Sequence, residues 1–357
     1  MDRATVDVYE RRGEEWAARR LPVRRDDALA FGRCVRHGGR RLDVGAGGGR
    51  YTNELGAPVV ALDAARTMLD LLADAAPGAL RVQADLERLP FAPSSFAGAW
   101  ANMCYQHVPR AAAPMALADL HHVVEVGGLV DLQVLHGDHD GHDLPGDDIG
   151  GRFFAGWQAE HLRDVLAGAG FTVEALTVHD QHEVVRATAA RARTLADTVA
   201  AGMRVLVCGL NPSIYSADRG VGYARPGNRF WPAAVEAGLV TRPLDPRRAL
   251  VEDRVGITDL CKRATVASAE LSRAEYVEGA ARVQRLVGWL RPRAVLFVGM
   301  EGWRKAIDRR AVAGLQPQPF GGRPAYVMPS TSGLNAVTSR PALVSHMRAV
   351  LAIADAG

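Results

Sequence analysis

The feature that most restricts the fold is a short apolar run that ends abruptly in a glycine turn. Residues 203–208 read Met-Arg-Val-Leu-Val-Cys, which predicts a buried strand, and Gly-Leu-Asn-Pro follows at once. Asn211 therefore lies at the carboxyl end of a strand, where open α/β sheets bind their ligands. The next segment, 212–231, is a long glycine-rich loop, and loops of this length in compact domains are usually functional.

Two motifs in this half resemble those of one enzyme family. Residues 209–231 read GLNPSIYSADRGVGYARPGNRFW. This is similar to the GINPG motif, the Ser- and Ala-rich loop with its aromatic residue, and the HPxNRFW motif of the mismatch-specific uracil/thymine DNA glycosylases. Residues 328–335 read MPSTSGLN and resemble the MPSxS and NPSGL forms of that family. The resemblance covers roughly residues 203–355 and implies a uracil-DNA-glycosylase-like α/β/α fold.

The resemblance implies a pocket for a base that has been flipped out of a DNA duplex. Asn211 would be the catalytic residue. It would orient the water that attacks the sugar, because an amide is too weak a base to take the proton itself. Tyr223 would stack on the flipped base. The other residues expected to line the base pocket are Leu210, Pro212, Ser213, Ser216 and Asn228.

A second group of residues is expected to enter the DNA. Leu334 stands where the family places an apolar wedge, which fills the space that the flipped base leaves. Mispaired bases are the easiest to unstack, so uracil or thymine opposite guanine in double-stranded DNA is the expected substrate. Neither motif contains a lysine, so we expect no lyase step and no cofactor for this reaction. The wedge group comprises Ser332, Gly333, Leu334 and Asn335.

The first half contains another strand that breaks into glycines. Residues 41–49 read RLDVGAGGG and predict a strand, a turn and then a helix, so that the backbone can approach a ligand closely. Two further predicted strands, 58–63 and 80–85, end in Asp63 and Asp85. A carboxylate at the first strand end suits the hydroxyls of a ribose, and the second suits an adenine amino group.

This set resembles the class I S-adenosylmethionine-dependent methyltransferases, which implies a Rossmann-like domain with S-adenosylmethionine as cofactor. The methyl acceptor stays open between a small molecule, an RNA base and a protein side chain. Neither the Asp/Asn-Pro-Pro-Tyr stretch nor the Pro-Cys motif of DNA base methylation follows the strand predicted at 96–103. The resemblance assigns the cofactor site to Asp43, Gly45, Gly47, Asp63, Asp85 and Asn102.

We therefore expect an α/β protein made of two doubly wound α/β/α domains. The predicted organisation is a methyltransferase-like domain at 1–190, a linker helix at 191–202 and a glycosylase-like domain at 203–357. Charge agrees with this division. Residues 201–357 carry 22 Lys and Arg against 12 Asp and Glu, a net charge of +10, whereas the rest of the chain is at −7. The basic part is the one expected to meet DNA.

Composition argues against several other classes. The four cysteines form no CxxC pair, and the His- and Asp-rich residues 136–143 fit a solvated loop, so we expect no metal. No apolar run is long enough to span a membrane, and the charged N-terminus lacks a signal segment, so we expect a cytoplasmic protein without a membrane partner. The rival hypothesis is a methyltransferase guided by a nucleic-acid-binding module that holds bases without cleaving them.

Overall fold

The computed structural model describes residues 1–335 and 337–356, and the chain divides into two compact units. Among the described residues, no helix is both long and apolar enough to cross a membrane. Unit 1 comprises Met1–Ala167 and Phe171–Ala192, and unit 2 comprises Gly168–Gly170 and Arg193–Gly357.

A seven-stranded sheet lies at the centre of unit 1, in the order β3-β2-β1-β4-β5-β9-β8. The first five strands are parallel, and β9 and β8 add antiparallel strands at one edge. The chain leaves β1 toward β3 and returns to β4, so the carboxyl ends of β1 and β4 flank the crevice at the switch in strand order. The strands are β1 (Arg41–Val44), β2 (Val59–Asp63), β3 (Leu80–Gln83), β4 (Phe96–Asn102), β5 (Val124–Leu135), β8 (Phe171–His179) and β9 (Val184–Arg191).

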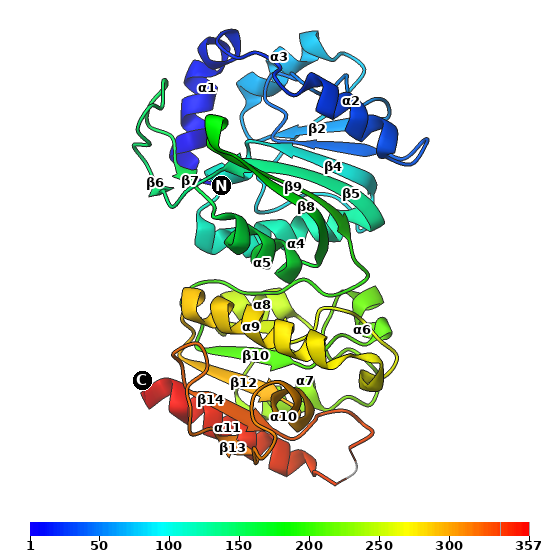
Figure 1. The fold of residues 1–357 in the computed structure, drawn as a ribbon, viewed down its shortest axis with the longest axis vertical. Helices are drawn as coiled ribbons and strands as arrows, with labels where there is room; N and C mark the ends of the chain where they lie inside the picture. Colours follow the sequence, from blue (N-terminus) through cyan, green and yellow to red (C-terminus); the bar gives the residue numbers. More distant parts are fainter. Residues whose placement is uncertain (336, 357) are drawn as a thin grey trace. The chain divides into compact units, whose positions relative to one another are not determined.

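Helices cover both faces of this sheet, with α4 and α5 on one side and α1, α2 and α3 on the other (Figure 1). Coverage on both faces explains why β1 and nearly all of β4 are buried, although β1 contains Arg41 and Asp43. The other elements are α1 (Arg3–Ala18), α2 (Arg25–Cys34), α3 (Arg66–Ala75), α4 (Ala113–Val123), α5 (Ala159–Gly168), a short β6 (Asp140–Gly141) and β7 (Phe154–Ala155) pair, and three 3-10 turns, η1 (Tyr105–His107), η2 (Arg110–Ala112) and η3 (Asp180–His182).

The helix expected after the glycines of residues 41–49 is not formed. Residues 47–55 make consecutive turns instead. Gly47 and Gly49 have φ angles of 54° and 80°, which a right-handed helix does not contain. The hydroxyl of Thr52 also donates to Asp43 Oδ2 at 2.6 Å, which ties the turns to β1. Our prediction failed here because it treated these glycines as the start of a helix.

Unit 2 contains a five-stranded sheet in the order β11-β10-β12-β14-β13, parallel except for β13. The chain runs from β10 to β11 on one side and returns to β12 on the other, so the switch in strand order lies between β10 and β12. Its strands are β10 (Val205–Gly209), β11 (Val255–Asp259), β12 (Ala294–Val298), β13 (Gly314–Leu315) and β14 (Ala325–Met328).

The helices of unit 2 complete an α/β/α arrangement, and the expected α/β class is confirmed for both units. Helices α7 and α11 pack together over one face of the sheet. Helix α9 begins with a capping box of Ser272 and Glu275 and ends at Arg291, which is in the left-handed conformation before a proline. The helices are α6 (Ile214–Arg219), α7 (Phe230–Ala237), α8 (Pro246–Val251), α9 (Arg273–Leu290), α10 (Met300–Ala306) and α11 (Arg340–Ala356), with a 3-10 turn, η4 (Ser268–Glu270).

Residues 191–202, expected to form a linker helix, are not helical. Thr198 instead pairs with Ile257 at the edge of β11. Asp197 accepts hydrogen bonds from Lys262 Nζ at 2.8 Å and from Arg282 Nη1 at 2.7 Å. The Ala- and Arg-rich composition favours a helix locally, but these tertiary contacts hold the segment extended.

Candidate functional sites

A cavity of about 540 Å³ opens at the carboxyl ends of the central strands of unit 1. Its size is that of a small-molecule site. Four of the expected cofactor residues line it: Gly45, Gly47, Asp63 and Asn102. Asp43 lines a smaller cavity of about 200 Å³ that shares several of the same residues.

The glycine turn is closely packed against its surroundings. A Cβ atom on Gly45 would lie 2.3 Å from the Cβ of Cys104, so only glycine fits there. The backbone N–H of Gly47 donates to Asp63 Oδ2 at 2.9 Å, which joins the turn to the end of β2. The turn and the strand end therefore form one rigid wall of the cavity.

Two carboxylates, the buried Asp43 and the half-buried Asp63, support this wall. Asp63 accepts a second backbone hydrogen bond from Ala65, and burial raises its pKa to about 6. Burial also raises the pKa of Asp43 to about 7, although the hydrogen bond from Thr52 opposes the shift. Asp63 retains lone pairs for ligand hydroxyls, whereas Asp43 mainly anchors the turn.

Two of the six expected residues, Asp85 and Asn102, are engaged by other groups. Asp85 does not line the cavity, and its carboxylate lies 2.8 Å from the amino group of Met1. Asn102 Oδ1 accepts from Arg24 Nη1 at 2.8 Å, and the same guanidinium pairs with Asp131. Asn102 therefore borders the cavity with its side-chain oxygen already bonded.

A chain of polar side chains lines the same cavity beyond β4. His107 Nδ1 lies 2.7 Å from the carbonyl oxygen of Phe153, so Nδ1 carries the proton and Nε2 is an acceptor. Tyr9 Oη lies 3.1 Å from that Nε2 and accepts from Arg152 Nη1 at 2.9 Å. Burial lowers the pKa of His107 to about 4, so the imidazole is neutral at pH 7. Sequence patterns do not reveal this chain, because its members are far apart in the sequence.

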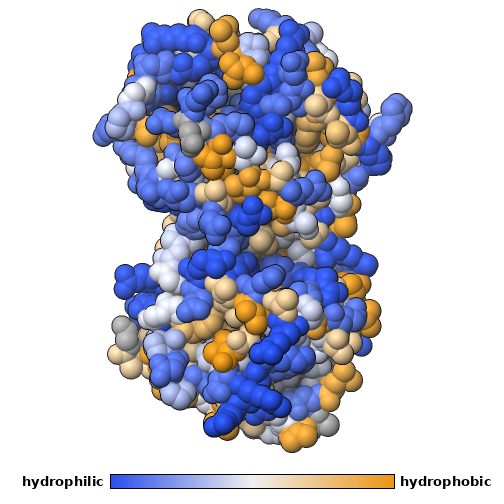
Figure 2. Space-filling view, in the orientation of Figure 1, coloured by the Kyte–Doolittle hydropathy of each residue, from blue (hydrophilic) through white to orange (hydrophobic). Residues whose placement is uncertain are grey.

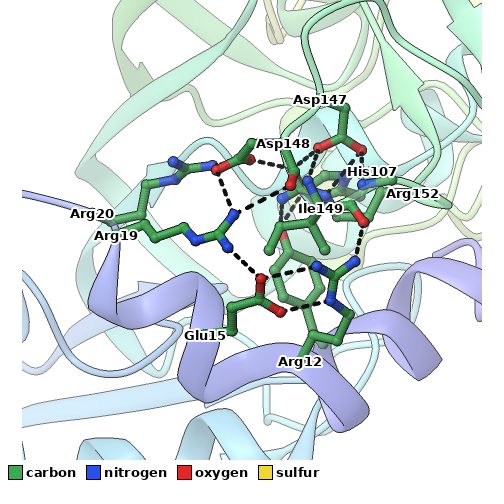
Figure 3. Close-up of polar contacts among 11 residues, drawn as sticks. Arg12, Glu15, Arg19, Arg20, His107, Asp147, Asp148, Ile149 and Arg152 are labelled. Atoms are coloured by element: carbon green, nitrogen blue, oxygen red, sulfur yellow. Dashed lines mark hydrogen bonds and ion pairs between the residues drawn. The ribbon is translucent and has the colours of Figure 1, made fainter.

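Helix α1 is tied to the segment around Asp148 by ion pairs and hydrogen bonds (Figure 3). Arg20 pairs with Asp148 at 2.5 Å, Arg12 donates to the carbonyl of Ile149, and Glu15 bridges Arg12 and Arg19. Arg152, in the same segment, pairs with Asp147. These contacts close one side of the cavity. Among the residues that the structure describes, no cluster of His, Cys, Asp or Glu could hold a metal ion.

In unit 2, the side chain of Asn211 is fixed at the end of β10. Its Nδ2 donates to Thr265 Oγ1 at 2.8 Å, to the carbonyl of Arg263 at 2.9 Å and to that of Pro212 at 3.2 Å. The residue is half-buried, and its Oδ1 makes no hydrogen bond to any described residue. The amide is therefore oriented with its acceptor atom free.

Tyr223 lies flat against Phe230, with ring centroids 4.0 Å apart and planes inclined by 20°. One face of the tyrosine is thus covered by protein, and the side chain is half-buried. Its hydroxyl is buried and makes no hydrogen bond to a described residue, and burial raises its pKa well above the usual value. Its φ angle of 58° belongs to the left-handed region, which is uncommon for a tyrosine.

A carboxylate that was not expected as a site residue lies beside Gly209 and the Tyr223 hydroxyl. Asp259 ends β11 directly opposite Gly209 at the end of β10, and burial raises its pKa to about 6. A Cβ atom on Gly209 would lie 2.3 Å from Asp259 Oδ1 and 2.9 Å from Tyr223 Oη. The available signal was an acid at a strand end, the same signal that identified Asp63 in unit 1.

Three of the expected base-pocket side chains take part in local structure. Ser213 caps α6 by accepting from Ser216 N at 3.2 Å, and the two hydroxyls lie 3.1 Å apart. Ser216 is buried, as is Pro212. Asn228 Oδ1 accepts from Phe230 N at 2.9 Å and so caps the start of α7. Neither Asn228 nor Ser216 lines any of the three cavities described in this section.

The second motif forms a loop beside a cavity of about 390 Å³, at the carboxyl ends of β10, β12 and β14. Leu210 and Asn335 line this cavity. Arg229 holds the loop by donating to the carbonyls of Ser332 and Asn335 at 3.2 and 2.6 Å. Gly333 packs against Gly227, because a Cβ there would lie 2.9 Å from the Gly227 carbonyl oxygen. The two motifs thus form one assembly at the switch point.

Leu334 projects from this loop and is 87% exposed. On the face drawn in Figure 2, hydrophobic side chains form scattered areas among hydrophilic ones. An aliphatic side chain on this hydrogen-bonded loop is therefore largely accessible from solvent. Asn335, in contrast, is bound to its own loop through Ser330 O and Thr338 Oγ1.

Comparison with known families agrees with both halves of this description. The methyltransferase domain model matches residues 42–131, and the uracil DNA glycosylase superfamily model matches residues 196–352. The chain joins a methyltransferase domain to a domain of the uracil DNA glycosylase superfamily. The methyltransferase match contains all six expected cofactor residues, and the glycosylase superfamily match contains both motifs of unit 2. Tyr9 and Arg152 lie outside the matched ranges.

Solved structures similar to this chain include several methyltransferases. They include the 1,6-didemethyltoxoflavin-N1-methyltransferase of Burkholderia thailandensis with S-adenosylhomocysteine, at 21% identity over 53% of this chain and 88% of that chain, with a TM-score of 0.43. The DhpI complex with S-adenosylhomocysteine is 21% identical over 53% of this chain and 96% of that one, with a TM-score of 0.43. A methyltransferase of Mesorhizobium loti is 18% identical over 46% of this chain and 96% of that one, with a TM-score of 0.38.

Proposed function

We propose that the glycosylase superfamily domain removes uracil, and thymine less readily, from G·U and G·T mispairs in double-stranded DNA. We place this activity in residues 203–357, and S-adenosylmethionine-dependent methyl transfer in residues 1–190. The observation that carries the first proposal is the amide of Asn211, whose nitrogen is held by three acceptors while its oxygen stays free at the strand end. Such an amide can orient one water molecule without moving.

The proposed reaction is hydrolysis of the N-glycosidic bond. The bond between the sugar C1′ and the base N1 breaks, and its electron pair leaves with the uracil. The water held by Asn211 forms the new C1′–O bond, and its proton passes to Asp259, whose raised pKa of about 6 suits a proton acceptor. The ionised Asp259 also favours the positive charge that develops on the sugar. The uracil anion takes up a proton from solvent and Asp259 releases the proton that it accepted, so the products are neutral uracil and an abasic site.

Substrate choice would come from the pocket and from the wedge. Tyr223 has one ring face on Phe230, and the base would stack on the other face. Ser213 replaces the glycine of the family motif, and its added bulk disfavours the methyl group of thymine. Leu334 would occupy the gap in the base stack, and a mispaired base is the easiest one to displace.

The methyltransferase proposal rests on the fit of the first cavity to S-adenosylmethionine. The close glycine turn admits a ligand along its backbone, and Asp63 can accept the two ribose hydroxyls. When bound, the cofactor supplies the methyl group as a sulfonium. The hydrogen-bonded chain of Arg152, Tyr9 and neutral His107 would bind the acceptor and hold the proton that it releases.

The glycosylase proposal is tested with a duplex that contains one G·U mispair. The protein is incubated with the duplex, and hot alkali then cleaves any abasic site. We expect cleavage with the wild type and its loss in Asn211→Ala, while duplex binding by both proteins is retained. If the wild type binds the duplex and leaves the strand intact, the domain is a non-cleaving module that delivers the methyltransferase to nucleic acid, and the proposal is wrong.

The methyltransferase proposal has a separate test that needs no knowledge of the acceptor. Isothermal calorimetry measures binding of S-adenosylhomocysteine to the full chain. We expect the wild type to bind and Asp63→Ala to lose most of its affinity while keeping its excision activity. Failure of the wild type to bind would contradict this proposal and leave the glycosylase proposal standing.

A further inference from the structure

Asp197 is a buried carboxylate of unit 2 with three side-chain donors, and its own side chain is 4% exposed. Oδ1 accepts from Thr258 Oγ1 at 2.7 Å and from Lys262 Nζ at 2.8 Å, and Oδ2 accepts from Arg282 Nη1 at 2.7 Å. Burial opposes ionisation of Asp197, but the two cations outweigh it and hold the pKa of this carboxyl below its ordinary value. The ionised group therefore holds its partners firmly, because loss of either cation would leave a buried charge less well paired.

The arginine bound to Asp197 also fixes the end of β11. Arg282 Nη2 donates to the carbonyl oxygen of Asp259 at 2.8 Å and to Thr258 Oγ1 at 3.1 Å. The Arg282 side chain is 8% exposed, which limits competition from solvent for these hydrogen bonds. Asp259 is the proton acceptor of the proposed reaction. Its position on the strand is therefore set by Asp197 through one guanidinium.

The lysine bound to Asp197 lies in the segment that holds Asn211. Lys262 is followed by Arg263, whose carbonyl oxygen accepts from Asn211 Nδ2 at 2.9 Å. Thr265, two residues further on, accepts from the same nitrogen at 2.8 Å through its hydroxyl. Because the Lys262 ammonium is bound to Asp197, this carboxylate also restrains the segment that orients the amide.

The charges of this cluster act on Asp259 as well. Burial raises the pKa of Asp259 to about 6, while the cations Lys262 and Arg282 lower it and the anion Asp197 raises it. Removal of Asp197 or of Lys262 should therefore shift the ionisation of Asp259 in opposite directions. Three further ionisable groups interact with Asp259 and are neutral at pH 7, because burial raises their pKa values: Tyr223, Cys208 and Cys261.

We propose that Asp197 is a positioning residue for uracil excision, an inference that rests on the proposed glycosylase function. Through Arg282 it holds Asp259, the proton acceptor. Through Lys262 it holds the segment that orients the amide of Asn211. Asp197 precedes β10 and lies outside both motifs of unit 2. Because it is buried and acts only through its partners, its loss should slow the chemical step without changing the affinity for DNA.

The test measures single-turnover excision from a G·U duplex at several pH values from about 5 to 8, together with duplex affinity. We expect Asp197→Asn to lower the maximal rate by about 10- to 100-fold, as loss of charge-assisted hydrogen bonds does, with duplex affinity within about twofold of the wild type. The pH at which the rate rises should move down in Asp197→Asn, because a negative charge near Asp259 is lost. It should move up in Lys262→Met, because a positive charge is lost.

The second variant keeps the test valid if the first unfolds. Asp197→Asn leaves two cations without a counter-ion, whereas Lys262→Met keeps the pair of Asp197 with Arg282. Lys262→Arg retains the positive charge and should restore the wild-type inflection. Thermal unfolding is measured on every variant, so that a loss of rate caused by unfolding is recognised.

The matched controls are Arg204→Met and Asp355→Asn, which remove the partners of another ion pair of unit 2. Both should keep the wild-type rate and inflection. An inflection that moves up in Asp197→Asn or down in Lys262→Met overturns the inference and leaves the glycosylase function standing. Rates and inflections equal to those of the controls do the same. Absence of excision by the wild type overturns both proposals.

Discussion

Arg229 Nη2 lies 2.6 Å from the carbonyl oxygen of Asn335. A residue near the end of the motif at 209–231 therefore holds the motif at 328–335. The same guanidinium also donates to the carbonyls of Ser332 and Thr338. One side chain therefore fixes the loop that carries Leu334 relative to the loop that carries Asn211. In the proposed reaction, this contact keeps the wedge and the water-binding amide in a constant arrangement.

We predict that Arg229→Lys slows uracil excision by about 10- to 100-fold. A lysine ammonium group cannot reproduce the planar set of hydrogen bonds that the guanidinium donates to three carbonyls, and each charge-assisted hydrogen bond is worth about 1.5–3 kcal/mol. Hydrogen exchange should be faster at Ser332 and Asn335. Arg242→Lys changes an exposed arginine in the same unit and serves as the control. Equal excision rates for the two variants would contradict the proposed role of Arg229.

Gly209→Ala should abolish excision and destabilise unit 2 by about 1–3 kcal/mol, the usual cost of overpacking. The new methyl group would lie 2.3 Å from Asp259 Oδ1, so the carboxylate or the strand must move. Gly222→Ala is the matched control, since its nearest contacts would be ordinary ones at 3.7 and 3.9 Å. Thermal unfolding and the G·U assay are measured on both, and a stable, active Gly209→Ala would show that the Asp259 position is not needed.

The rate of excision should rise with pH through about 6. Burial holds the pKa of Asp259 at about 6, so the carboxylate is protonated below that value and cannot accept the water's proton. Asp259→Asn should give a flat profile and a rate lower by about 10²–10⁴-fold, the usual contribution of a general base. Asp218→Asn, which removes an exposed carboxylate, should keep the wild-type profile. An unchanged inflection in Asp259→Asn would assign the titration to another group.

Leu334→Ala should weaken excision from a G·U duplex while leaving excision from single-stranded uracil DNA unchanged. The wedge acts only where a base must be displaced from a stack, and single strands lack that barrier. Val251→Ala removes methyl groups from another exposed aliphatic residue of unit 2 and is the control. If both substrates lost activity equally in Leu334→Ala, the side chain would be acting on the pocket and not on the DNA stack.

The sequence predicts the elements whose signals are local. The strand predicted at 58–63 is observed at 59–63, and the strand predicted at 96–103 is observed at 96–102. In each case a continuous apolar run is bounded by Gly, Pro or a polar residue nearby. The position of Asn211 at a strand end followed from the same kind of signal, since β10 ends at the glycine before it.

Features that depend on distant partners were not predictable. The segment 191–202 is extended because Asp197 meets Lys262 and Arg282, which no local pattern indicates. Asp259 is an acid at a strand end, a signal that the sequence contains, but its place beside Gly209 requires the pairing of β10 with β11, which only the topology supplies.

The stability of unit 1 should fall as pH rises from about 4 to 7. The pKa of Asp43 is raised to about 7 in the folded protein against an ordinary value of 3.8, so the folded state binds more protons than the unfolded state in this window. Asp43→Asn cannot ionise and can still accept from Thr52. We expect the free energy of unfolding of Asp43→Asn to exceed that of the wild type. This difference should be larger at pH 8 than at pH 5 by on the order of 2 kcal/mol.

Differential scanning calorimetry of the full chain measures this difference, and the transition of unit 1 is the one that S-adenosylhomocysteine shifts upward. Asp70→Asn removes an exposed carboxylate from α3 and should track the wild type at both pH values. The physical cause is burial of a charge behind the glycine turn, so the gap must widen with rising pH. A gap that narrowed would mean that the ionised Asp43 is stabilised by the fold, contrary to the environment described above.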